Sequence, residues 1–485
     1  MRFVLKQTRL GLRNSTVRIP FRYGSACLTR CPQAVLEATI ETGGHVQRGY
    51  SGDCLPPSWF DKTPGKSFAR QIDDMLAVIG LAEKTLVEEA AAPVELFPAW
   101  LAAYERVHER AREWQLCELL ASFGLSMVER AVMDGLARAA NASFAEAVRA
   151  NLYGIDPGEV HASLAGLKPA DWLPAAPPRS IFVRHTVGLG DPLTAGDIAG
   201  GDRVDDGLPQ ALEEYIQRTG TRYFKVKVSG DLDRDVDRLR RIAALAEKHL
   251  GTDYHLTLDG NEQYKQADQF DALVEAIRST AELETLAGNI LAIEQPLDRH
   301  IALDEAHTAG IRELGRWKPV IIDESDAALG SYPEAMRLGY RGVSSKNCKG
   351  PIKSLFNAGL TWLANNRHAS GEFLLTGEDL CTVGIVPVQS DLALVATLGL
   401  AHVERNGHHY HRGLGYLPAA EQRAALAAHP DFYGQQHDVI GPRLSGGRFE
   451  IASLQCTGFG FAVEPEMDAM QRVDQWRFES LGLEE

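Results

Sequence analysis

Residues 223–228 read Tyr-Phe-Lys-Val-Lys-Val, and this short stretch gives the first indication of the fold. Side chains of a β-strand point alternately to opposite faces. Lys225 and Lys227 therefore share one face, and the apolar residues between and after them share the other. We expect a strand whose apolar side packs against helices and whose two lysines point into an interior polar space.

Four later strands end in a charged residue with the same parity. In Leu291-Ala-Ile-Glu, for example, Glu294 lies opposite Leu291 and Ile293. From Lys227 onward the charged positions are separated by 32, 35, 29 and 23 residues, and each interval is about one β–α unit. These positions are Asp259, Glu294, Asp323 and Lys346. We expect five consecutive strands to bring the lysines and the three carboxylates together.

Strand and helix signals alternate throughout this part of the chain. After the lysine strand, Asp231 or Asp233 can cap a helix that carries an apolar stripe and ends at Gly251. Eight such units predict a (β/α)₈ TIM-type barrel with its active site at the carboxyl ends of the strands. The predicted strands are Ile181–His185, Tyr223–Val228, Tyr254–Asp259, Leu291–Glu294, Val320–Asp323, Gly342–Lys346, Phe373–Thr376 and Leu400–Glu404.

The N-terminal part predicts a capping domain of α+β type. Residues 1–60 are β-rich, and the apolar pattern is helical from Lys66 to about Tyr153. The stretch 156–179 is rich in proline and alanine, which is typical of a linker. We therefore predict the cap, with its helical insert and linker, over residues 1–178 and the barrel over 179–445.

Composition excludes several classes of partner. The chain has 485 residues and a formal net charge of −15, which argues against nucleic acid and anionic membranes. Its seven cysteines are irregularly spaced and form no C-x-x-C pair, which favours a reducing compartment. There is no apolar run of signal-peptide or membrane-spanning length. We expect a cytoplasmic protein.

The converging charges suggest a chemistry. Three carboxylates brought together repel one another and need a cation, and oxygen ligands on rigid strands favour Mg²⁺ or Mn²⁺. Such an ion could bind the carboxylate of a small substrate and stabilise the enolate formed when the α-proton leaves. The lysines would flank the α-carbon, and a neighbouring ammonium group together with a divalent cation would lower the pKa of a basic lysine; Lys225 is that neighbour for Lys227.

Five strand-end motifs, in this order, resemble those of the enolase superfamily. They are most similar to the lysine–lysine branch of its mandelate racemase/muconate lactonizing enzyme family. The motifs are Lys225-Val-Lys227, Leu258-Asp-Gly-Asn, Ile293-Glu-Gln-Pro, Asp323-Glu-Ser and Lys346-Asn-Cys-Lys-Gly. Residues 35–44, 128–136 and 457–464 resemble cap and tail segments of the family. The resemblance implies that a C-terminal segment, 446–485, returns to the cap.

The resemblance also implies residue roles and a reaction. It assigns one Mg²⁺ to Asp259, Glu294 and Asp323, the acid/base pair to Lys227 and Lys346, and an electrostatic helper to Lys225. With a lysine on each face of the α-carbon, racemisation or epimerisation is the leading interpretation. A lyase reaction, such as syn-dehydration, or cycloisomerisation is the alternative, and a metabolite-binding barrel without turnover is the third. A symmetric homo-oligomer is the family-level expectation.

Some features depart from the family pattern and leave the substrate class open. The sixth-strand motif continues Lys349-Gly-Pro instead of with two glycines, and the seventh strand has no histidine. The base of the mandelate racemase branch is therefore absent. The helical insert is also longer than the family leads us to expect.

Substrate contacts are predicted at further positions. Glu404 ends the eighth strand facing inward, and Asn261 lies in the third-strand motif. Arg22 and Tyr23 lie where the family has a mobile cap loop, and residues 52–54 (Gly-Asp-Cys) are candidates for a second loop.

Two alternative ligand assignments remain open. Glu324 could replace Asp323 as a ligand, although parity favours Asp323. A histidine cluster near the eighth strand could bind zinc, although substrate contact or a surface loop is the preferred interpretation. It comprises His402, His408, His409 and His411.

Overall fold

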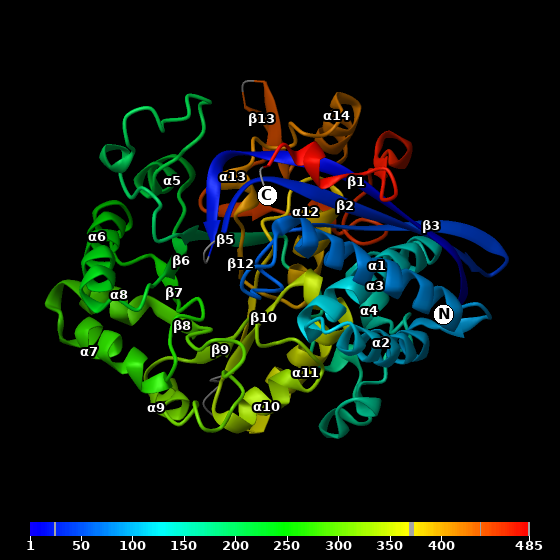
Figure 1. Ribbon diagram of the computed structural model, residues 1–485, viewed down its shortest axis with the longest axis horizontal. Helices are drawn as coiled ribbons and strands as arrows, with labels where there is room; N and C mark the ends of the chain where they lie inside the picture. The colour runs from blue at the N-terminus through cyan, green and yellow to red at the C-terminus, as the bar shows by residue number, and fades with distance from the viewer. Residues whose placement is uncertain (24–25, 368–372, 437, 484–485) are drawn as a thin grey trace.

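The computed structural model describes residues 1–483 apart from 24–25, 368–372 and 437, and the side chains of Tyr23 and Ala26 also lie outside the description. Eight parallel strands follow one another in sequence order around a closed barrel, and the last pairs with the first. They are β5 (Ser180–Val187), β6 (Tyr223–Lys227), β7 (His255–Asp259), β8 (Ile290–Glu294), β9 (Val320–Ile322), β10 (Gly342–Ser345), β11 (Leu374–Gly377) and β12 (His402–Glu404). Each predicted strand is found within two residues, so the predicted (β/α)₈ barrel is confirmed (Figure 1).

Helices follow the barrel strands and cover their outer side. The predicted signals of α6 are confirmed, because Asp231 accepts a hydrogen bond from the Arg234 amide at 3.2 Å and Gly251, at φ +62°, ends the helix. The helices of this part are α5 (Leu212–Thr219), α6 (Leu232–Leu250), α7 (Asp271–Ser279), α8 (Glu284–Asn289), α9 (Ile311–Trp317), α10 (Ser331–Leu338), α11 (Pro351–Arg367), α12 (Val386–Thr397), α13 (Gly407–Tyr410) and α14 (Ala419–Ala428).

The cap combines an antiparallel sheet with four helices. Its strands are β1 (Arg2–Tyr23), β2 (Ala26–Thr42) and β3 (His45–Cys54), with β4 (Val94–Glu95) added to β1. Its helices are α1 (Phe68–Glu89), α2 (Leu96–Glu113), α3 (Glu118–Ala139) and α4 (Phe144–Arg149). Gly49 lets β3 approach α3 closely, since a Cβ atom there would lie 2.2 Å from the Gly135 nitrogen. The predicted α+β cap is therefore confirmed.

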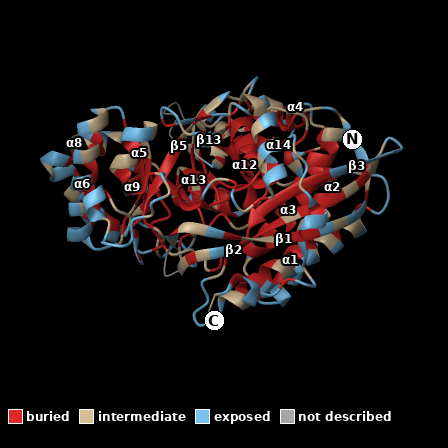
Figure 2. Cartoon of the chain, turned by 90° about the horizontal axis from the view of Figure 1, so that it is seen from above, coloured by how far each residue is buried: buried red, intermediate tan, exposed pale blue. Residues whose placement is uncertain are grey.

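Burial shows where the cap and the barrel meet. Every residue of α3 from 119 to 137 is buried, as is the whole of α12, whereas α6 and α8 have exposed outer faces (Figure 2). The turn at Asn347–Lys349, directly after Lys346, packs against α3. The central cap helix therefore supports the end of a strand that carries a predicted catalytic lysine.

The C-terminal part contacts both the barrel and the cap. Strands β13 (Tyr433–Gln436) and β14 (Val439–Pro442) form a hairpin, and β15 (Arg448–Glu450) pairs with β5 of the barrel. Strand β16 (Gln471–Arg472) pairs with β1, and the Trp476 indole donates to the Asn14 side chain at 2.9 Å. The domain boundaries at 178 and 445 remain our proposal.

Within the described ranges, no helix is both long enough and apolar enough to cross a membrane.

Candidate active site

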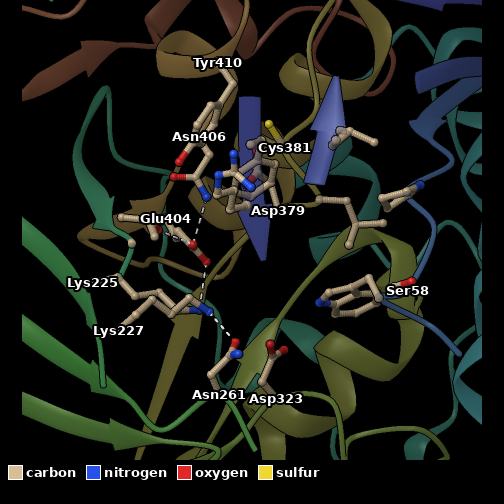
Figure 3. Close-up of a pocket in the computed structure, with 18 of the residues that line it drawn as sticks. Ser58, Lys225, Lys227, Asn261, Asp323, Asp379, Cys381, Glu404, Asn406 and Tyr410 are labelled. Carbon is tan, nitrogen blue, oxygen red and sulfur yellow. Dashed lines mark hydrogen bonds and ion pairs between the residues drawn. The ribbon is translucent and has the colours of Figure 1, made fainter. Parts of the chain in front are cut away.

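A pocket lies between the carboxyl ends of the barrel strands and the cap. The cap contributes Phe21, Arg22, Ser58, Trp59 and Lys62 to its lining. Barrel residues that line it include Lys225, Lys227, Asn261, Asp323, Lys346 and Glu404. Figure 3 shows Lys225, Lys227 and Glu404 pointing into this space from one side and Ser58 facing it from the other.

Lys225 lies at the centre of a cluster of acids. Its Nζ is 2.5 Å from Glu294 Oε1 and 3.0 Å from both Glu378 Oε2 and Glu404 Oε2. Asp259 Oδ2 is 3.2 Å away. Four carboxylates on four strand ends thus surround one buried ammonium group, so the predicted inward parity of these strands is correct.

The other two predicted lysines each pair with a predicted ligand. Lys227 Nζ donates to Asp259 Oδ2 at 2.6 Å and to Asn261 Oδ1 at 2.8 Å (Figure 3). Lys346 Nζ donates to Asp323 Oδ2 at 2.7 Å. Strands β6 and β10 stand four places apart in an eight-stranded barrel, so these lysines reach the pocket from opposite walls.

Asp323 is held by more groups than the sequence indicated. Lys349 donates to Asp323 Oδ1 at 2.8 Å and also to the backbone oxygen of Asp323 at 2.6 Å. The Ser344 hydroxyl donates to Oδ1 as well. On its open side Lys346 lies over the ring of Trp59, with Nζ 4.6 Å from the ring centroid.

Glu378, directly after β11, belongs to the site but was not predicted. Its Oε1 accepts hydrogen bonds from Arg184 at 2.6 Å and from Thr376 at 3.4 Å. Its Oε2 faces Lys225 at 3.0 Å and Lys346 at 3.2 Å. The signal was strand parity: Thr376 and Glu378 share a face, as Lys225 and Lys227 do.

Three of these carboxylates come close enough together to hold a metal ion. One oxygen each from Glu294, Asp323 and Glu378 lies within 4.8 Å of the others, and no other such group of His, Cys, Asp or Glu is found among the described residues. Glu294 Oε2 is buried and has no hydrogen-bond partner. Asp259 turns instead toward Lys225 and Lys227.

Charge and burial act against each other on these groups. Burial raises the pKa of Glu294 well above its usual range, and the charge of Glu378 raises it further. Burial also acts to raise the pKa of Asp323, but Lys346 and Lys349 outweigh it and hold that pKa well below the usual range. The charge of Glu294 is therefore less well compensated than that of Asp323.

The surrounding protein groups have opposing effects on the pKa of Lys227. Burial and the charge of Lys225 lower it, but Asp259 outweighs both, so the pKa of Lys227 is raised. The pKa of Lys346 is also raised, because Asp323 and Glu378 outweigh its burial. The lowered pKa expected for Lys227 includes the effect of a bound divalent cation and stays a prediction.

The predicted substrate contacts have different outcomes. Glu404 and Asn261 line the pocket, and exposed Arg22 lies at its mouth, where a wider groove begins. Tyr23 ends β1, but its side chain lies outside the described part of the structure. Residues 52–54 do not line the pocket. They are buried in β3, where Asp53 pairs with Arg130, and the loop that follows supplies the lining instead.

The described structure gives no support to either of the two alternative ligand assignments. Glu324 is buried and lines the pocket, but it is not in the carboxylate group described above. The four histidines do not converge in the described structure. His402 Nδ1 lies 3.0 Å from Arg184, and His409 Nδ1 lies 2.6 Å from the Tyr215 hydroxyl. The zinc interpretation has no support here, because these rings form no metal-binding group among the described residues.

A second unpredicted feature fastens the cap to the barrel. Glu262, in the loop after β7, accepts hydrogen bonds from Arg299 at 2.7 and 2.9 Å and pairs with Lys62 of the cap. Arg299 also donates to the backbone oxygens of Trp59 and Phe60, both at 2.9 Å. We call Glu262, Arg299 and Lys62 the clamp, because together they fix the cap loop beside the pocket.

Comparison with known proteins gives a family model and a fold. Residues 207–345 match the family model described as "Enolase C-terminal domain-like". A comparison with curated protein sequences finds no match. A mandelate racemase/muconate lactonizing protein from Herpetosiphon aurantiacus is similar in structure, with 16% identity, 95% of this chain and 99% of that chain covered, and a TM-score of 0.58.

Two further solved structures are similar over comparable lengths. Muconate lactonizing enzyme from Pseudomonas fluorescens, complexed with muconolactone, is 17% identical over 96% of this chain and 98% of that chain, with a TM-score of 0.58. Dipeptide epimerase from Enterococcus faecalis V583, complexed with Mg and the dipeptide L-Leu-L-Tyr, is 15% identical over 96% and 100%, again with a TM-score of 0.58. The resemblance predicted from the strand-end motifs is thereby confirmed.

Proposed function

We propose, from the premise that this chain has the enolase-superfamily fold of mandelate racemase/muconate lactonizing proteins, that it removes the α-proton of a small carboxylate substrate. Our leading assignment is racemisation or epimerisation with Lys227 and Lys346 as the two acid/base groups. The main support for this assignment is that the two lysines enter one pocket from strands four places apart. An α-carbon between them would present one face to each amine.

The site fits a divalent cation. The buried, unpartnered oxygen of Glu294, with an oxygen of Asp323 within 4.8 Å, is what a hard cation requires; Glu378, and not Asp259, is the third member of that group. We propose Asp259, Glu294 and Asp323 as the residues that would hold Mg²⁺, with Mn²⁺ as a substitute. Such an ion would supply electrostatic stabilisation of negative charge on the substrate carboxylate.

The protein's own residues do the remaining work. Lys227 and Lys346 carry the proton to and from the α-carbon, and Lys225 adds positive charge beneath the substrate. Glu404, Asn261 and Arg22 are proposed to contact the substrate. Lys346 is buried and Lys227 is only partly exposed, which limits the access of water to the proton being moved.

Lyase or cycloisomerase chemistry is the alternative on the same residues, with one lysine as base and the other only stabilising charge. A solved neighbour of this fold is complexed with muconolactone and another with a dipeptide, so the fold alone does not choose between these reactions. A metabolite-binding barrel is less favoured, because both lysines are in place. We extend the proposal to a cytoplasmic homo-oligomer.

The test is exchange of the α-proton in D₂O. The protein, supplied with Mg²⁺ or Mn²⁺, is incubated with a library of carboxylates that includes both enantiomers of each chiral member. We expect deuterium at the α-carbon of at least one chemical class, with loss of optical activity if both lysines act. Binding of library members without any deuterium incorporation would favour the metabolite-binding barrel.

A further inference from the structure

Glu378 occupies a position that two roles could explain. It has an oxygen within 4.8 Å of oxygens from Glu294 and Asp323, so it could be a third or fourth metal ligand. It also contacts both Lys225 and Lys346. The partners of its individual oxygens distinguish these roles.

Both oxygens of Glu378 already have cationic partners. Arg184, itself fully buried, donates to Oε1 at 2.6 Å. Lys225 and Lys346 approach Oε2 at 3.0 and 3.2 Å. Glu294 differs, because its Oε2 has no partner at all. A cation would relieve Glu294 of an unpaired buried oxygen, whereas at Glu378, as at Asp323, it would compete with existing ion pairs. Glu378 differs from Asp323 in that one of its oxygens contacts two lysines from opposite walls of the barrel.

Arg184 also orients Glu378. Arg184 lies on β5, and its second NH group is 3.0 Å from His402 Nδ1 on β12. The guanidinium is therefore fixed between two strands, and it fixes Oε1 in turn. This leaves Oε2 directed at the two lysines, which come from β6 and β10 on opposite sides of the barrel.

We propose that Glu378 is a positioning residue: a carboxylate that spans Lys225 and Lys346, is oriented by Arg184, and is not a metal ligand. The positioning role rests on the proposed function, but the Mn²⁺ titration and the crystal structure below test it without a known substrate. Glu378 gives both ammonium groups one shared acceptor, in addition to the contacts that Lys225 makes with Glu294 and Lys346 makes with Asp323. Two lysines on opposite walls of the barrel thereby keep a fixed separation.

The test compares Glu378→Gln with Glu294→Gln and the wild-type protein in Mn²⁺ titrations followed by electron paramagnetic resonance. The amide of Glu378→Gln keeps the shape but loses the charge that holds the lysines. We expect its Mn²⁺ affinity to stay within about threefold of wild type, and that of Glu294→Gln to fall by about tenfold or more. Equal losses in the two variants would make Glu378 a ligand and overturn the proposal.

A crystal structure of Glu378→Gln with Mn²⁺ gives the second readout. We expect the Nζ atom of Lys225 or Lys346 to move away from its wild-type position, and two unmoved lysines would contradict the proposal. On a substrate found in the D₂O screen, kcat should fall on the order of 100-fold with KM nearly unchanged, because two charge-assisted contacts are lost.

The role of Glu378 can still be tested if Glu378→Gln does not fold or if no substrate is found. If Glu378→Gln does not fold, Arg184→Lys replaces it, because lysine cannot reach Glu378 and His402 together. Its turnover should fall while its Mn²⁺ affinity stays near wild type, and wild-type turnover would refute the orienting role. If the wild-type protein exchanges no carboxylate proton, the proposed function fails, and the titration and the lysine positions still decide the role of Glu378.

Discussion

Replacing Glu262 by glutamine tests the clamp between the cap and the barrel. Only 4% of the Glu262 side chain is exposed. Burial acts to raise its pKa, but Arg299 and Lys62 outweigh burial and lower the pKa to about 2 from an ordinary 4.5. A difference of about 2.5 pKa units corresponds to about 3 kcal/mol of folding free energy. The free energy of unfolding of Glu262→Gln should be lower than that of wild type by about this amount at neutral pH.

The pH dependence of the stability loss in Glu262→Gln follows from the direction in which folding changes the pKa of Glu262. The unfolded chain takes up a proton at Glu262 near pH 4.5, whereas the folded protein does so only near pH 2. The unfolded state therefore binds more protons in this interval, and the contribution of the carboxylate declines as the pH falls through it. The stability difference between wild type and variant should be full above about pH 5.5 and should shrink toward pH 2.

Urea-induced unfolding at pH 7, 5, 4 and 3 measures this difference. Glu282→Gln, at an exposed position, is the matched control and should change stability by less than about 0.5 kcal/mol at every pH. The reasoning is refuted if Glu262→Gln matches this control at pH 7. It is also refuted if the loss at pH 7 persists undiminished at pH 3, because the carboxylate charge would then not be its source.

Three further predictions concern the pocket. Asp259→Asn should abolish metal-dependent exchange while circular dichroism stays unchanged, and wild-type exchange would remove Asp259 from the ligand set. Lys227→Ala and Lys346→Ala should each abolish racemisation, yet each should still exchange the α-proton of one enantiomer; if one variant loses exchange with both enantiomers, a single base and the lyase alternative are favoured. Trp59→Leu should lower kcat by about tenfold, because the ring face over Lys346 is lost, whereas Trp59→Phe should lower it less; equal kcat values for the two variants would contradict this.

The barrel could be predicted from sequence because its strands carry two independent signals. Apolar residues alternate with charged ones, and the intervals match one β–α unit. These two signals together are enough to place Lys227, Asp259, Glu294 and Asp323 on one inward face. Strand bounds differ by no more than two residues, as at β9, where Asp323 follows the strand instead of ending it. Local periodicity is sufficient for this level of detail.

The partners of those residues could not be predicted in the same way. Glu378 and Arg184 obey the same parity as Lys225, but the apolar pattern of β11 and β5 predicts the strands and not which charges pair across the barrel. The clamp is harder still, because Glu262 and Arg299 lie in loops whose meeting depends on the tertiary path. The ion pair of Lys227 is a related case, since its neighbour Lys225 is visible in the strand motif, whereas its contact with Asp259, 32 residues away, depends on the tertiary structure.

The backbone at the ends of β7 and β8 shows how the site and the clamp depend on each other. Asn261, Glu262 and Gln295 adopt φ values of +48°, +64° and +35°, in the left-handed region that non-glycine residues seldom occupy. Each costs on the order of 1 kcal/mol or more, so each needs an offsetting contact. The Glu262 amide donates to the Gln295 backbone oxygen at 3.0 Å, which ties the two strained turns together.

The side chains of these three residues make the contacts that offset the backbone strain, and each holds a different part of the pocket. Asn261 accepts from Lys227, Glu262 accepts from Arg299 in the clamp, and Gln295 Oε1 accepts from the Asp323 amide at 2.8 Å. A glycine at any of them would relieve the backbone but release a lysine, the cap loop or a predicted ligand. Local sequence preference is violated where the pocket requires it, so the same residues that strain the fold also define the site.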